Sequence, residues 1–148
     1  MTPAPELRLL RAAEPFVTSP GRAALPEAYD LSVTARTGTA VSLLRSASGA
    51  ELTVRLDPDE GTVTLDRGDW PRKDAEAVEP IVVRLPRHED EELTVRVLVD
   101  GSLYELFVGD RAVVTERVYR RPDDVPQLVV AAPGATVTGW ELVPPTHG

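Results

Sequence analysis

The sequence contains no cysteine and no asparagine, and aromatic residues make up only 5% of it. Without cysteine the chain forms no disulfide and offers no thiolate to a metal, and the redox compartment is left open. Without asparagine it carries no N-glycosylation sequon. Its apolar runs are too short for a membrane-spanning helix, so we expect no membrane association. The first residues, MTPAPELRLLRAAEP, lack the basic and apolar regions of a signal peptide. These absences do not fix a localisation.

Positive charge is also scarce. Sixteen lysine and arginine residues face 24 aspartate and glutamate residues, which gives a net charge of -8. Such a chain repels a phosphate backbone, so we expect no nucleic-acid partner. The two histidines, His88 and His147, show no metal-ligand spacing, and there is no glycine-rich phosphate loop. The charge run at residues 87–92 is typical of a solvated turn. We therefore expect no metal and no cofactor.

The residues that are plentiful favour short strands. The chain has 20 valines, 14 prolines and 10 glycines, and 42% of its 148 residues are hydrophobic, which is sufficient for one packed domain. Alternating apolar residues separated by turn residues indicate strands throughout the second half of the chain and most of the first. The expected strands lie at residues 29–35, 41–45, 51–56, 63–65, 81–85, three within 93–114, 127–132 and 136–143.

About ten or eleven short strands with this spacing predict an all-β fold, a two-sheet antiparallel β-sandwich of the jelly-roll, concanavalin A-like type. We expect residues 1–148 to form a single domain. In it, residues 1–28 are a linker-like lead-in with one short strand, and residues 29–143 are the sandwich core. Residues 15–26, rich in proline, glycine and alanine, indicate an irregular connection within the lead-in.

The dipeptide Asp100-Gly101, between two alternating runs, predicts a tight hairpin. With these two residues as the loop, Val99 faces Ser102 and Arg96 lies opposite Glu105. The charged pair would then explain Glu105, which lies inside a strand, whereas most of the acidic residues lie in turns. A pair of catalytic carboxylates remains open on composition, because sequence spacing does not show which acids lie close together.

Sugar binding requires an aromatic face framed by hydrogen-bonding side chains. The best candidates are Trp70, Arg67 and Asp69, in a polar segment expected to be a long loop over residues 67–79. The alternative is that Trp70 folds back as a lid on the core. Trp140, in the last alternating strand, is expected to be a core residue.

The segment LTVRVLVDGSLYELFVGDRAVVTERV, residues 93–118, resembles the C-terminal β-sandwich module of glycoside hydrolase family 32, the invertases, inulinases and levanases. Shorter matches lie at Leu65-Asp66-Arg67, at residues 43–46 and 5–11, and at Trp140-Glu141-Leu142. The residues that the resemblance assigns to the structure of the module are Asp66, Arg96, Asp100, Ser102, Glu105, Phe107 and Trp140.

The resemblance implies that the catalytic residues of the family lie in a separate N-terminal five-bladed propeller. Its N-D-P-N-G, R-D-P and E-C motifs are missing from this sequence. We therefore expect no catalytic residues and no enzyme activity of the chain by itself. The expected function is that of an accessory domain that packs on a glycosidase propeller, in cis or in trans, and that stabilises it or mediates homo-oligomers. The alternative is a stand-alone, lectin-like module that binds fructan or another glycan.

Overall fold

The structure is a computed structural model that describes residues 11–68, 70, 80–86, 92–109, 111–131 and 134–143. Within these ranges the chain forms eleven strands and no helix. The strands are β1 (Gly21–Ala24), β2 (Ala28–Ala35), β3 (Thr39–Arg45), β4 (Glu51–Asp57), β5 (Thr62–Asp66), β6 (Ile81–Arg84), β7 (Leu93–Asp100), β8 (Leu103–Val108), β9 (Ala112–Arg117), β10 (Val125–Val130) and β11 (Thr136–Glu141).

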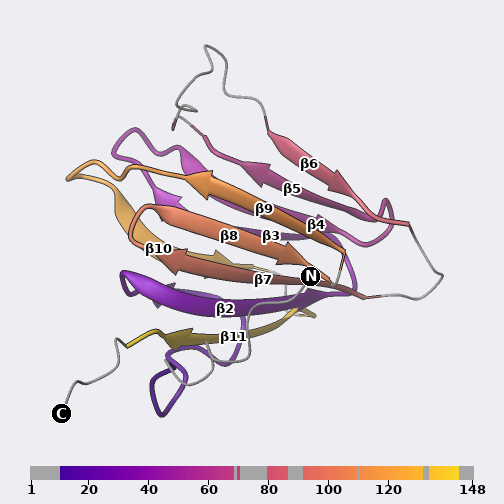
Figure 1. Ribbon diagram of the computed structural model, residues 1–148, viewed down its shortest axis with the longest axis horizontal. Coiled ribbons are helices and arrows are strands. Elements are labelled where there is room, and N and C mark those ends of the chain that lie inside the picture. Colours follow the sequence, from indigo (N-terminus) through magenta and orange to yellow (C-terminus); the bar gives the residue numbers. More distant parts are fainter. Residues whose placement is uncertain are drawn as a thin grey trace.

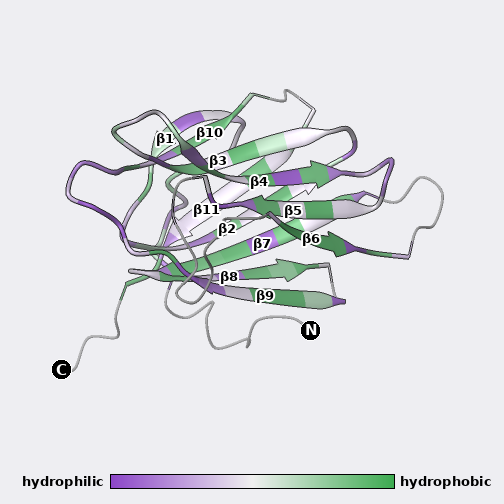
Figure 2. Cartoon of the chain, turned by 90° about the horizontal axis from the view of Figure 1, so that it is seen from above, coloured by the Kyte–Doolittle hydropathy of each residue, from purple (hydrophilic) through white to green (hydrophobic). Residues whose placement is uncertain are grey.

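The strands form two antiparallel sheets (Figure 1). One sheet has six strands in the order β1-β10-β3-β4-β5-β6, and the other has five in the order β11-β2-β7-β8-β9. Figure 2 shows them as two stacked layers. The predicted all-β, two-sheet antiparallel sandwich with ten or eleven strands is therefore confirmed.

The core lies between the sheets and is built by alternate residues of each strand. Leu31 and Val33 of β2 and Leu52 and Val54 of β4 are buried, whereas Ser32 between the first two is only half-buried. Side chains of a strand point alternately to its two faces, so the alternation read in the sequence places valine and leucine inside. This pattern explains why the expected strand positions agree closely with the structure.

The lead-in was expected to contain one short strand, but the sequence did not indicate where it lies. The expectation of an irregular connection over residues 15–26 is wrong for Gly21–Ala24, which form β1 and pair with β10. Three of these four residues are exposed, so the strand has no apolar alternation to reveal it. Its backbone hydrogen bonds to a neighbouring strand, rather than burial of its side chains, define it.

The lead-in also borders the other sheet. Arg11 and Val17 form isolated bridges to Leu142 and Gly139, and the Gly139 N–H donates to the carbonyl of Val17 at 3.0 Å. The Phe16 ring packs edge-on against Tyr29, with ring centroids 6.3 Å apart. Residues 11–17 thus run beside β11. The division into a lead-in and a core within one domain of 148 residues stays a prediction.

The β7–β8 hairpin differs from the prediction by a shift in register. Asp100 pairs with Leu103, so the loop is Gly101-Ser102 rather than Asp100-Gly101. Gly101 has a φ of +58°, and a two-residue hairpin turn requires such a positive φ at its first loop position. Because pairing moves by two residues, the same apolar side chains still face inward. The expected Arg96–Glu105 pair is wrong: Arg96 lies opposite Phe107, and Glu105 lies opposite Leu98.

Two glycines with nearly the same backbone geometry provide a test of local packing. Gly68 (φ +56°) and Gly101 (φ +58°) both occupy the left-handed region, but a Cβ on Gly68 would lie 2.8 Å from the Glu51 carbonyl oxygen, whereas a Cβ on Gly101 would meet nothing within 4 Å. We expect Gly101→Ala to cost about 1–2 kcal/mol from backbone strain alone. Gly68→Ala should cost clearly more. Urea unfolding of both variants measures the difference, and equal losses would contradict the close approach of Gly68 to β4.

Candidate functional site

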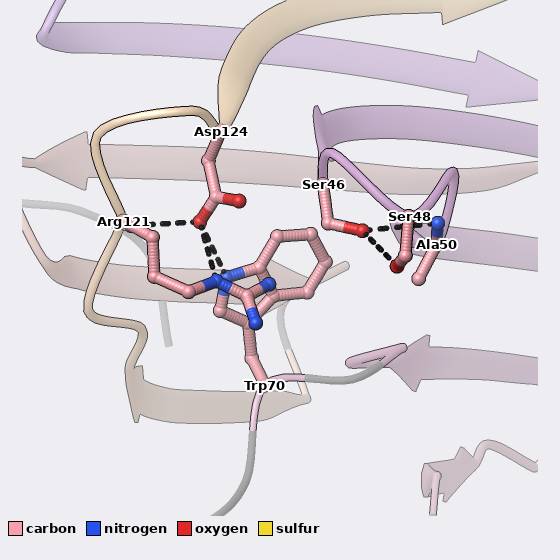
Figure 3. A network of polar contacts seen from close by, with 6 residues as sticks. All are labelled: Ser46, Ser48, Ala50, Trp70, Arg121 and Asp124. Carbon is pink, nitrogen blue, oxygen red and sulfur yellow. Dashed lines mark hydrogen bonds and ion pairs between the residues drawn. The ribbon is translucent and has the colours of Figure 1, made fainter.

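Trp70 anchors a polar cluster at one end of the sandwich (Figure 3). Its indole N–H donates to Asp124 Oδ2 at 2.9 Å, and the same oxygen accepts the Arg121 backbone N–H at 2.8 Å. The Arg121 guanidinium lies 5.1 Å from the Trp70 ring centroid. Arg121 and Asp124 belong to the segment between β9 and β10, whereas Trp70 follows β5. The cluster therefore ties together two segments that are far apart in the sequence.

Asp124 is ionised in this cluster. Burial disfavours its charged form, but the hydrogen bonds from the Arg121 backbone, the Trp70 indole and the Arg121 side chain outweigh burial and lower the pKa of Asp124 below its ordinary value. The carboxylate thus holds both the indole and the guanidinium in place.

The structure brings two of the three candidate sugar-binding residues to this end of the sandwich but presents neither to solvent. Trp70 is 3% exposed and packs in the core, and Arg67 is 1% exposed, with its Nη1 3.8 Å from Glu116 Oε2. Asp69 lies outside the described residues. A sugar has no open indole face to stack on here, which supports the alternative in which Trp70 covers the core.

An open groove of about 590 Å³ lies beside the cluster. Three segments line it: the residue before β2, the β7–β8 turn and the segment between β9 and β10. Its lining residues are Glu27, Gly101, Ser102, Val118, Tyr119, Arg120, Arg121, Pro122 and Asp124. Tyr119, which is 66% exposed, is the most exposed large hydrophobic residue in the described part of the chain. Sequence patterns did not indicate this groove, because Tyr119 follows a strand and has no motif around it that signals a ligand.

Two tyrosines inside the same sandwich remain neutral. Burial raises the pKa of Tyr29 well above its ordinary value and also raises the pKa of Tyr104. The Tyr29 hydroxyl has no hydrogen-bond partner among the described residues. Neither phenol therefore contributes negative charge near neutral pH.

A second polar cluster lies on the outward side of the five-stranded sheet. Asp30 of β2 is fully buried, and Arg96 of β7 binds it with two hydrogen bonds, Nε to Oδ1 at 2.8 Å and Nη2 to Oδ2 at 2.6 Å. Arg11 of the lead-in donates from Nε to Oδ2 at 2.8 Å. Its guanidinium also stacks 4.0 Å from the centroid of the Trp140 ring. We call these four residues the Asp30 cluster.

Burial disfavours ionisation of Asp30, but the hydrogen bonds from Arg96 and Arg11 outweigh it and lower the pKa of Asp30. Sequence reasoning missed Asp30, because it occupies an outward position of a strand where a solvated carboxylate is ordinary. The expectation that Trp140 belongs to the core is wrong. It lies opposite Asp30 on the outward side of β11 and is half-buried under Arg11.

The other residues of the family motif lie in turns or on the outward surface of the sheet. Asp66 accepts the Gly68 backbone N–H and pairs with Arg55 at 3.0 Å. Ser102 accepts a hydrogen bond from Arg117 at 3.1 Å in the hairpin turn that follows Asp100. Glu105 and Phe107 are half-buried on the outward side of β8.

Among the described residues, no group of three histidine or acidic side chains is arranged to hold a metal ion, and no helix could cross a membrane. His88 and His147 lie outside these residues, as does most of the charge run at 87–92.

The two stacked antiparallel sheets place the chain among the β-sandwich domains. The model of the family described as "Glycosyl hydrolases family 32 C terminal" matches residues 16–141, and the chain therefore belongs to this family. The resemblance read from residues 93–118 is confirmed.

Solved structures share the fold. The chain is similar to a sucrose-6-phosphate hydrolase from Lactobacillus gasseri, with a TM-score of 0.78, 21% identity and coverage of 95% of this chain and 30% of that one. It is also similar to an exo-inulinase from Aspergillus awamori, with a TM-score of 0.75, 15% identity and coverage of 93% of this chain and 31% of that one. A family 32 β-fructofuranosidase from Bombyx mori matches with a TM-score of 0.69, 20% identity and coverage of 97% of this chain and 30% of that one. A comparison with curated proteins gives no significant match. The chain thus spans about a third of the length of the enzymes it resembles.

Proposed function

We propose that this protein is the non-catalytic accessory domain of a family 32 β-fructosidase, which packs on a catalytic propeller and stabilises it. The observation that carries the proposal is the family match over residues 16–141, together with the small share, about 30%, of each similar enzyme that the chain covers. The other two thirds of those enzymes have no counterpart in this chain.

The outward side of β8 and β9 supports the proposal by its apolar side chains. Leu103, Phe107 and Val113 are half-buried on this side, on either side of the Glu105–Thr115 pair. On the six-stranded sheet, the outward positions of β4, β5 and β6 combine Arg55 and Thr64 with a single exposed apolar side chain, Val82. An accessory domain needs an apolar surface to pack on its partner. We therefore propose the outward side of β8 and β9 as the surface that contacts the propeller.

A stand-alone fructan-binding module that uses Trp70 and Arg67 is the less favoured alternative. Both side chains are buried, and Arg121 lies over the indole ring. Such a module would need the segment between β9 and β10 to move before a sugar could reach Trp70.

Activity and association measurements test the proposal. The purified chain should hydrolyse neither sucrose nor inulin. When it is mixed with the catalytic domain of a family 32 enzyme from the same organism, produced without its C-terminal third, it should raise the melting temperature of that domain. Phe107→Asp should abolish the increase, because a charge at the apolar surface resists desolvation.

Thr64→Asp, which places the same charge on the outward face of the other sheet, is the matched control and should leave the increase unchanged. Hydrolysis by the isolated chain, or no increase on mixing, would contradict the accessory function. An effect of Thr64→Asp equal to that of Phe107→Asp would contradict the proposed surface.

A further inference from the structure

The groove between Glu27, the β7–β8 turn and the segment after β9 has no function in the packing proposed above. Its volume of about 590 Å³ falls within the range of about 300–1,000 Å³ that is typical of ligand sites. It is separate from the outward side of β8 and β9, since neither Phe107 nor Val113 lines it.

The walls of the groove are held in place by backbone hydrogen bonds. The Gly101 N–H donates to the Glu27 carbonyl at 3.2 Å, and the Val118 N–H donates to the Ser102 carbonyl at 2.8 Å. Arg121 and Asp124 close a further turn, in which the Asp124 N–H donates to the Arg121 carbonyl at 3.0 Å. The backbone of such a site needs little rearrangement when a ligand binds.

The side chains of the groove combine one aromatic face with hydrogen-bonding groups of both charges. Tyr119 exposes two thirds of its surface. Arg120 and Glu27 are 4.0 Å apart, a loose ion pair that leaves N–H donors and carboxylate oxygens available to a ligand. The Ser102 hydroxyl, which accepts a hydrogen bond from Arg117, adds an O–H donor.

The charges of the lining residues balance. Arg120 and Arg121 are matched by Glu27 and Asp124, and the pKa of Asp124 is lowered, so that its carboxylate is ionised near neutral pH. A groove without net charge, in a chain with a net charge of -8, does not attract an anion. Its chemistry suits an uncharged ligand with many hydroxyl groups and one apolar ring face.

We propose that this groove binds a neutral carbohydrate, with one sugar ring stacked on Tyr119 and its hydroxyls bonded to Arg120, Glu27 and Ser102. The site differs from the Trp70 site considered in the sequence, because Tyr119 is exposed and no rearrangement is needed. It also does not depend on the accessory function, since the isolated chain should bind the sugar.

The test is a calorimetric titration of the intact chain with short fructo-oligosaccharides, levan, maltopentaose and xylopentaose, and with inorganic phosphate as the anionic probe. We expect heat from at least one neutral sugar and none from phosphate. Tyr119→Ala should weaken the binding about tenfold through loss of the stacking face, whereas Tyr119→Phe should retain it. Val82→Ala, another exposed hydrophobic residue on β6, is the matched control and should change nothing.

A spectroscopic readout locates the sugar. In a Trp140→Phe variant, Trp70 is the only tryptophan, and its indole binds Asp124 in the wall of the groove. Its emission should shift when the sugar is added. Melting temperatures of the Tyr119 variants verify that each is folded. The proposal is overturned if no neutral sugar gives heat, if only phosphate binds, or if Tyr119→Ala binds as well as the unmodified chain.

Discussion

Asp30→Asn should lower the free energy of unfolding by about 3 kcal/mol. This value is the lower end of the range of about 3–5 kcal/mol for breaking a buried ion pair, because Arg11 and Arg96 remain 19% and 18% exposed and keep some hydration. Two arginines would lose the carboxylate that accepts their hydrogen bonds. Urea unfolding followed by circular dichroism measures the loss.

Asp66→Asn is the matched control, since Asp66 makes an exposed pair with Arg55. Breaking that pair should cost no more than about 1 kcal/mol. Equal effects of the two substitutions would contradict the importance of the Asp30 cluster.

The stability lost in Asp30→Asn should depend on pH. The pKa of Asp30 is lowered in the folded chain, so its stabilisation is fully present above the unfolded pKa of about 3.9 and is lost as the pH falls through the lower folded pKa. The difference in unfolding free energy between the unmodified chain and Asp30→Asn should therefore stay constant from pH 7 to about pH 5. It should shrink in more acidic solution, where Asp30 itself becomes neutral.

Trp70→Ala should lower the free energy of unfolding by about 3–5 kcal/mol, the cost typical of removing a buried large aromatic side chain. The indole packs in the core and its N–H donates to a carboxylate. Trp70→Phe keeps most of the volume and should lose about 1–3 kcal/mol, because Asp124 loses a hydrogen bond in a buried position.

Trp140→Ala provides the contrast. Its ring is half-buried on the outside of the sheet, and removing it should cost about 1 kcal/mol, mainly the stacking of Arg11. Urea denaturation followed by far-ultraviolet circular dichroism compares the three variants. If Trp70→Ala unfolds within 1 kcal/mol of the unmodified chain, Trp70 is not a core residue and its assignment to sugar binding becomes the better explanation.

The sequence predicted the sheets well because strand alternation is a local property. Leu31 and Val33 reveal their burial through their spacing alone. Register is less local, and the hairpin shows why: Asp100-Gly101 identified the turn, but the positive φ of Gly101 places the glycine first in the loop and moves the pairing by two residues.

The polar clusters could not be predicted, because each joins distant segments. Arg96 and Asp30 are 66 positions apart, and Trp70 and Asp124 are 54 apart. The motif that identified the family contains Arg96 but not its partner. From the sequence, Arg96 was therefore expected to form a surface ion pair with Glu105. In the fold it binds the buried carboxylate of Asp30, which lies between Arg96 and Arg11.

The course of residues 11–17 beside β11 has a consequence for the solution behaviour of the protein. An uncovered edge strand offers unpaired N–H and C=O groups to other chains and promotes aggregation. Residues 11–17 lie along the free edge of β11 through the bridges to Leu142 and Gly139, and the ion pair of Arg11 with Asp30 holds this segment in place. In acid, protonation of Asp30 would loosen this fastening and expose β11. We therefore expect the Asp30 cluster to limit pairing of other chains at this one edge, in addition to stabilising the fold.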